Sequence, residues 1–107
     1  MELFRDARGA VAFSVDKMKK VNLFDTARMF CDVYGLTAGQ EQSAHVHAGC
    51  DKVYFVLDGT GTFTIGDVER TVGSGHAIHA PAGLTHAVRN NGPAPLSLLV
   101  FMAPKPS

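Results

Sequence analysis

The sequence predicts an all-β domain, built as a small antiparallel barrel or sandwich. Apolar segments of strand length alternate with turns rich in glycine and proline at short intervals, a pattern typical of all-β folds. The chain has 107 residues, which is enough for one hydrophobic core. It contains no heptad pattern, internal repeat or low-complexity tract.

The expected strands follow one another along most of the chain. Segment 28–36 (RMFCDVYGL) is rich in bulky apolar residues, and segment 52–57 (KVYFVL) is apolar on both faces, as in a strand between two layers. The sequence DGTG at 58–61 predicts a hairpin turn, because glycine allows the positive φ of tight turns. Further strands are expected at 62–65, 69–72, 77–80, 86–89 and 96–102.

Residues 1–21 are less regular than the rest. The segment VAFSV at 11–15 could add a strand, whereas 16–20 is polar enough to be a loop. We therefore expect an N-terminal arm or extra strand at 1–21, which either pairs with another subunit or frays. A single barrel domain is expected at 22–107.

Composition and charge exclude several classes of partner. Ten basic and ten acidic residues balance, so neither nucleic acid nor a membrane is expected as a partner. No apolar stretch approaches the roughly 20 residues that cross a bilayer, and the N-terminus MELFRDARGA has no apolar signal-peptide core. The two cysteines, Cys31 and Cys50, do not form a disulfide framework. These features predict a cytoplasmic domain.

Two histidines lie one residue apart, at 45 and 47. On a strand, residues i and i+2 point to the same face, so His45 and His47 could bind one metal ion. A surface pair or a hydrogen-bonded core pair explains this spacing equally well. The later segment GHAIHAPAGLTHAVRN favours the metal, because a turn at Pro81 and Gly83 would present His86 at the start of the next strand.

At these residues the chain resembles the cupin superfamily, whose motifs are G-x5-H-x-H-x(3,4)-E-x6-G and G-x5-P-x-G-x2-H-x3-N. The resemblance implies a double-stranded β-helix, or jelly roll, of two antiparallel sheets with a metal site inside the barrel. It also implies a divalent transition metal (Fe, Zn, Mn, Ni or Cu) with His45, His47 and His86 as its ligands. The matching positions are Gly39, His45, His47 and Gly59 in the first motif, and Gly75, Pro81, Gly83, His86 and Asn90 in the second.

The glutamate of the first motif is missing. With three residues after His47 the acidic position falls on Asp51, but one residue too many then separates it from Gly59. With four residues the spacing to Gly59 is correct and the occupant is Lys52. We therefore expect Lys52 at the glutamate position, and Asp51 near the metal only if the strand bulges.

This replacement changes the charge of the site. A protonated lysine cannot be a metal ligand, and three neutral imidazoles leave the charge of the ion uncompensated. We expect a small anionic ligand, such as a carboxylate, that pairs with Lys52, with Tyr54 as a second candidate for substrate binding. His79 is a candidate fourth ligand or a hydrogen-bond partner of a ligand, although a hydrogen-bonded barrel residue is the simpler interpretation.

The remaining side chains have simpler interpretations. His76 follows a glycine and is expected at the surface near a turn. The core is expected to include Tyr54, Phe55, Phe63, Leu99 and Phe101.

Fold does not determine function in this superfamily. One hypothesis is a metal-dependent enzyme, dioxygenase-like or isomerase-like, that acts on a small organic molecule. A second is a non-catalytic binding or sensing module, with or without metal, and a third is a purely structural barrel. The resemblance also implies a homodimer, with which the apolar faces of 28–36 and 96–102 are compatible.

Overall fold

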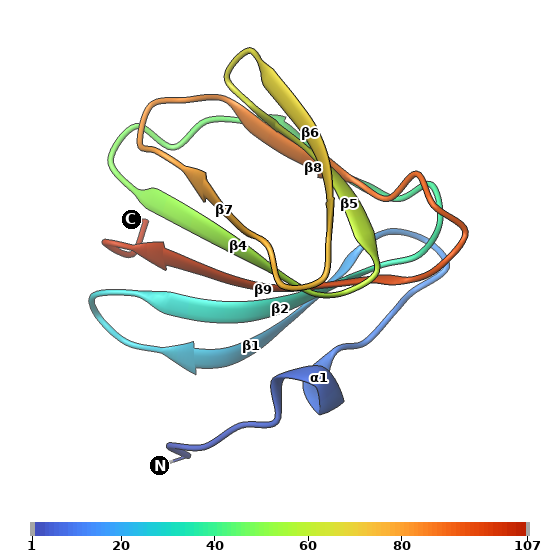
Figure 1. Cartoon of the computed structure of the whole chain (residues 1–107). Helices are drawn as coiled ribbons and strands as arrows, with labels where there is room; N and C mark the ends of the chain where they lie inside the picture. Colours follow the sequence, from blue (N-terminus) through green and yellow to red (C-terminus); the bar gives the residue numbers. More distant parts are fainter. Residues whose placement is uncertain (1, 107) are drawn as a thin grey trace.

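Nine strands and one short helix make up residues 2–106, the part of the chain that the computed structural model describes. They are α1 (Ala7–Ala10), β1 (Lys19–Asp25), β2 (Phe30–Leu36), β3 (Glu41–His45), β4 (Asp51–Asp58), β5 (Thr60–Ile65), β6 (Val68–Gly73), β7 (Ala77–Ala80), β8 (His86–Arg89) and β9 (Leu96–Ala103). The strands form two antiparallel sheets, of order β1-β2-β9-β4-β7 and β3-β8-β5-β6, which face each other as a barrel (Figure 1). The predicted all-β fold is confirmed.

The predicted strands differ from the structure at the N-terminal side of the molecule. All seven strands expected from 28 onwards are present, but β1 and β3 were not predicted. The strand considered at 11–15 does not form. Instead, Val11 packs on the outside of the larger sheet, and the carbonyl of Ser14 accepts a hydrogen bond from the side chain of Gln40. The first strand begins at Lys19, inside the segment expected to be an arm.

The turn at Gly59 is a corner between the sheets and not the hairpin that the sequence predicted. Strands β4 and β5 belong to different sheets, so the chain crosses the barrel here. Gly59 has φ 87°, and a Cβ at this position would collide with the carbonyl oxygen of Pro95. Only glycine fits this corner, which fixes the register of the strand that leads into it.

One face of β4 points into the interior of the barrel. Lys52, Tyr54 and Val56 are each 1% exposed or less, in the register that the spacing to Gly59 predicts. Two of the residues expected in the core, Tyr54 and Phe63, belong to the cluster between the sheets. This cluster consists of Tyr34, Leu36, Tyr54, Val56, Phe63, Ala80, Val88, Leu96, Leu98 and Val100.

The other face of β4 and β9 points away from the interior. Phe55 and Leu99 are half-buried in a second apolar cluster outside the larger sheet, and Phe101 is 40% exposed. The expectation that Phe101 belongs to the core is wrong, because alternation along β9 buries Val100 and Met102 instead.

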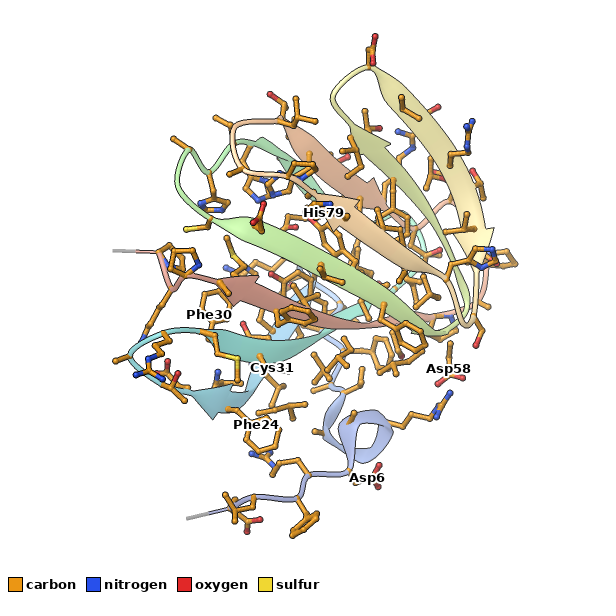
Figure 2. All side chains as sticks on the ribbon, turned by 60° about the vertical axis from the view of Figure 1, so that its left-hand side comes forward. Asp6, Phe24, Phe30, Cys31, Asp58 and His79 are labelled. Atoms are coloured by element: carbon orange, nitrogen blue, oxygen red, sulfur yellow. The ribbon has the colours of Figure 1, made fainter. Side chains whose placement is uncertain are left out.

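Helix α1 covers part of this outer face. The guanidinium of Arg8 donates to the carbonyl of Leu57 at 3.1 Å and to the carboxylate of Asp58 at 3.2 Å. Figure 2 shows Phe24 and Cys31 on the same side of the sheet as the helix. Among the described residues, no helix is long and apolar enough to cross a membrane.

Candidate metal centre

Three imidazoles meet at one end of the barrel. One ring nitrogen from each of His45, His47 and His86 lies within 4.8 Å of the other two. His45 is the last residue of β3, and His86 is the first residue of β8. These two residues are direct partners in the ladder between the strands, and their ring centroids are 4.1 Å apart. The fold therefore brings together the three histidines that the sequence predicts as metal ligands.

His47 reaches the cluster by a route that the sequence did not predict. It lies after the end of β3, in the loop to β4, and so the pairing of His45 and His47 does not depend on the two-residue period of a strand. The carbonyl oxygen of His47 accepts a hydrogen bond from the Gly83 N–H at 2.9 Å. This hydrogen bond joins the β7–β8 loop to the β3–β4 loop, and both loops lie at the same end of the barrel (Figure 1).

Hydrogen bonds set the orientation of two of the rings. Nδ1 of His45 lies 2.8 Å from the carbonyl of Ser43, and Nδ1 of His86 lies 3.1 Å from the carbonyl of Leu84. A carbonyl can only accept, so each Nδ1 carries the proton and each Nε2 has its lone pair free. Nε2 of His86 is buried without a hydrogen-bond partner among the described residues. An unpaired buried nitrogen is costly, and a bound metal ion would satisfy it.

The chemistry of the donor set fits a transition metal. Burial lowers the pKa of His86 to about 4, against the effect of the Leu84 carbonyl, and burial also lowers the pKa of His45. Both imidazoles are therefore neutral at neutral pH, which is the form that binds metals. Nitrogen ligands about 2.1 Å from one ion are at most about 4.2 Å apart, so small rotations of the rings would close the set.

Lys52 lies at the position of the missing glutamate. It is 1% exposed, and its ammonium Nζ donates to Oε1 of Gln42 at 3.0 Å. Nζ is also 4.7 Å from the ring centroid of Tyr54 and 5.3 Å from that of Tyr34. Burial, and then the positive charge of Lys20, lower the pKa of Lys52 to about 7. The lysine lines the same cavity as His45 and His47.

Tyr54 contacts both Lys52 and Gln42 from the barrel interior. It is completely buried, its hydroxyl donates to the same Oε1 of Gln42 at 2.9 Å, and its ring packs against Phe63 and His86. Burial raises the pKa of Tyr54, and the nearby Tyr34 raises it further, so the hydroxyl remains a donor. The cavity beside the histidines is not lined by Tyr54, which contacts Gln42 and Lys52 behind its wall.

Asp51 and His79 lie away from the three histidines. The carboxylate of Asp51 accepts a hydrogen bond from the Ala82 N–H at 3.0 Å and lies 3.5 Å from Nε2 of His79. Both side chains are more than half exposed. His79 points outward because the alternation along β7 directs the adjacent residues Ile78 and Ala80 inward. Figure 2 shows His79 on β7. No bulge turns Asp51 toward the cluster, and His76 is exposed at a turn as expected.

The sequence did not predict the cavity next to the histidines. It has a volume of about 800 Å³ and is open to solvent. Gln42 was missed because the ladder shifts register between Gln42 and His45, so that two residues an odd number apart line the same wall. Three further lining residues, Glu41, Ser43 and Ala44, belong to β3 like Gln42. The others come from distant segments and are Lys17, Met18, Lys20, Phe30, Tyr34, Met102 and Pro106.

Comparison with known families agrees with this architecture. The family model described as a cupin domain matches residues 33–102, which covers both histidine segments and most of the two sheets. The chain belongs to the cupin family. In this cupin the histidine cluster lies at one end of a barrel of two sheets, and Lys52, at the position where the resemblance implies an acid, is buried beside it.

Three individual proteins illustrate the similarity. A crystal structure of a protein from Thermus thermophilus is 41% identical, with a TM-score of 0.94, and the match covers 96% of this cupin and 98% of that chain. A double-stranded β-helix protein of Klebsiella pneumoniae, 22% identical over 97% of this chain and 91% of its own, shares the fold with a TM-score of 0.90. An uncharacterized protein of Methanocaldococcus jannaschii is 29% identical over 62% of this chain. The chain spans about half the length of that curated relative, 53%.

Proposed function

We propose that this cupin binds a divalent transition metal ion through His45, His47 and His86, and a small anionic organic molecule in the adjacent cavity. The observation that carries the proposal is the buried Nε2 of His86, which has no hydrogen-bond partner in the described chain and lies within 4.8 Å of the other two ligand atoms. Iron, zinc, manganese, nickel or copper in this position would act as a Lewis acid toward an oxygen of the ligand.

The residues of the chain supply the rest of the site. Lys52 offers an ammonium group with one donor on Gln42 and its remaining donors available. A carboxylate is a suitable partner, because a charge-assisted hydrogen bond is stronger than a neutral one. Tyr54 and Gln42 hold Lys52 in place from the interior. Together these residues orient a carboxylate next to the three imidazoles.

Metal analysis tests the proposal directly. The protein, purified without a histidine tag, is expected to hold about one metal ion per chain, and the variant His86→Ala is expected to lose it. His76→Ala is the matched control, because His76 is an exposed histidine outside the cluster. A folded wild-type protein that binds none of the five metals after dialysis would overturn the metal site.

An alternative is a non-catalytic cupin that senses or binds a small molecule without metal. It is favoured by the lysine side chains of the cavity, which could hold an anion by themselves. Turnover of carboxylates by the metal-loaded protein, with and without O₂, separates a dioxygenase-like or isomerase-like enzyme from a sensor. Binding without turnover, retained in His86→Ala, would support the sensor.

A homodimer is the further partner that we propose. Phe101 is 40% exposed on the outer face of β9, next to the half-buried Leu99, and such apolar surface often marks an interface. Analytical ultracentrifugation is expected to give a dimer for the wild type and a monomer for Phe101→Glu. A wild-type monomer at all concentrations would contradict this.

A further inference from the structure

The cavity beside the histidines has an unusual charge balance. Three lysines line it, Lys17, Lys20 and Lys52, against a single acid, Glu41. Within residues 2–106, none of the three lysines forms an ion pair. The net charge of the whole chain is zero, so the excess of positive charge is local to this cavity. A cavity of this kind attracts anions.

The lysines occupy two separate positions. Lys52 is buried on β4 beside the histidines, whereas Lys20 is exposed on β1. The ring of Tyr34 lies near both, with Nζ of Lys20 5.2 Å and Nζ of Lys52 5.3 Å from its centroid. The distance between the two ammonium groups is thus no greater than the sum of these two lengths. Because Lys52 is buried beside the histidines and Lys20 is exposed on β1, a short molecule with an anionic group at each end could contact one ammonium group with each.

The lining around the lysines is largely apolar. Met18, Phe30 and Met102 contribute side chains to the same cavity, and Figure 2 shows Phe30 on the larger sheet. Apolar walls with a few charged groups are typical of sites for small organic molecules. They suit an aliphatic chain better than a compact inorganic anion.

We propose that the ligand is a short aliphatic dicarboxylate, with one carboxylate at Lys52 and the histidines and the other at Lys20 and Lys17. The inference rests on the anion binding put forward as the proposed function, and it adds the number of charges on the ligand and the residues that recognise the second one. Lys20 is a specificity residue in this arrangement. Two like charges close to the same ring repel each other, and a dianion neutralises both.

Calorimetric titration of the metal-loaded protein tests the inference. The probes are succinate and butyrate, which have the same number of carbons but two carboxylates and one. The wild type is expected to bind succinate about tenfold or more tightly than butyrate, a preference of about 1.4 kcal/mol. The variant Lys20→Met is expected to lose most of this preference by weakening succinate alone, while Lys52→Met weakens both probes.

The matched control is Lys19→Met. Lys19 is the neighbour of Lys20 on β1, is also exposed and does not line the cavity, so its loss is expected to leave both affinities unchanged. Equal affinity for succinate and butyrate, unchanged in Lys20→Met and in Lys17→Met, would overturn the dicarboxylate while leaving the proposed function intact. Failure of both probes to bind would overturn the anion site itself.

Discussion

The ammonium group of Lys52 donates a 3.0 Å hydrogen bond to Oε1 of Gln42 inside the barrel. The same oxygen also accepts from the hydroxyl of Tyr54, and no carboxylate of the described chain lies within 4.0 Å of the lysine. A buried charge without a counter-ion is costly. The lysine that replaces the acid of the cupin motif is therefore held by neutral groups alone, which is consistent with a role in binding an anion.

Lys52→Met is expected to stabilise the metal-free protein. Methionine fills a similar volume without a charge, and Gln42 keeps Tyr54 as a hydrogen-bond donor. Replacing buried ion pairs with apolar side chains often stabilises a protein by about 1–4 kcal/mol, and a buried charge without a partner is more costly still, so we expect a gain in this range. Urea denaturation measures the free energy of unfolding, with the exposed Lys19→Met expected to change it by less than about 0.5 kcal/mol. A clear loss of stability in Lys52→Met would contradict the prediction.

The pH dependence of stability is expected to report the same burial. The pKa of Lys52 is about 7 in the folded protein, against 10.5 for an ordinary exposed lysine. Between about pH 7 and 10.5 the unfolded chain therefore binds more protons than the folded protein. The free energy of unfolding should then rise with pH across this interval and be lowest below about pH 7. Its charged and titratable neighbours are Lys20, Asp32, Tyr34, Tyr54, His45 and His86.

The difference between wild type and Lys52→Met isolates this contribution from all other groups. Their free energies of unfolding should converge as the pH rises from about 7 to about 10. A difference that stays constant over this range would show that Lys52 keeps its charge in the folded protein.

The parts of the site that the sequence predicts are those fixed by local backbone geometry. The corner at Gly59 admits only glycine, so counting back from it gives the correct face for Lys52. The turn that delivers His86 is closed by a hydrogen bond from the Leu84 N–H to the Pro81 carbonyl, which a Pro-x-Gly pattern predicts.

The parts that the sequence does not predict depend on contacts between distant segments. Gln42 faces the cavity only because β3 shifts register against β8, and no pattern within β3 indicates this shift. Lys20 and Lys52 both lie near the ring of Tyr34 because β1, β2 and β4 belong to the same sheet. The order of strands in a sheet is a property of the whole fold, and periodicity within one strand carries no information about it.

Asp51 is expected to affect the metal site through the backbone and not as a ligand. Its carboxylate accepts from the Ala82 N–H, and the adjacent Gly83 N–H holds the carbonyl of His47. Asp51→Ala should weaken metal binding about tenfold, as is typical of groups that orient ligands. Asp51→Asn retains an acceptor oxygen and should restore the affinity. Equal losses in both variants, measured by competition with a chelator, would instead indicate a direct ligand.

Asn90 is expected to stabilise the fold and not to bind the ligand. It is 1% exposed, its amide donates to the carbonyls of Leu36 and Ala94, and its oxygen accepts from the Gly92 N–H. Asn90→Ala should lower the free energy of unfolding by at least about 2 kcal/mol, because it leaves buried carbonyls unsatisfied. The exposed neighbour Asn91→Ala should cost less than about 1 kcal/mol. Similar losses for both would contradict this role.

Lys52→Glu is expected to convert the site into one with four ligands. The side chain at this position points inward beside His45 and His47, and a carboxylate would add both a ligand and a compensating negative charge. Metal affinity should rise by about tenfold or more, and succinate binding should be lost. The metal-free variant should be destabilised by its buried carboxylate, so its Tm should increase on adding metal by more than that of the wild type. Lys52→Gln controls for the loss of the positive charge alone: if it raised metal affinity as much as Lys52→Glu, the gain would come from removing repulsion, and the carboxylate would not be a ligand.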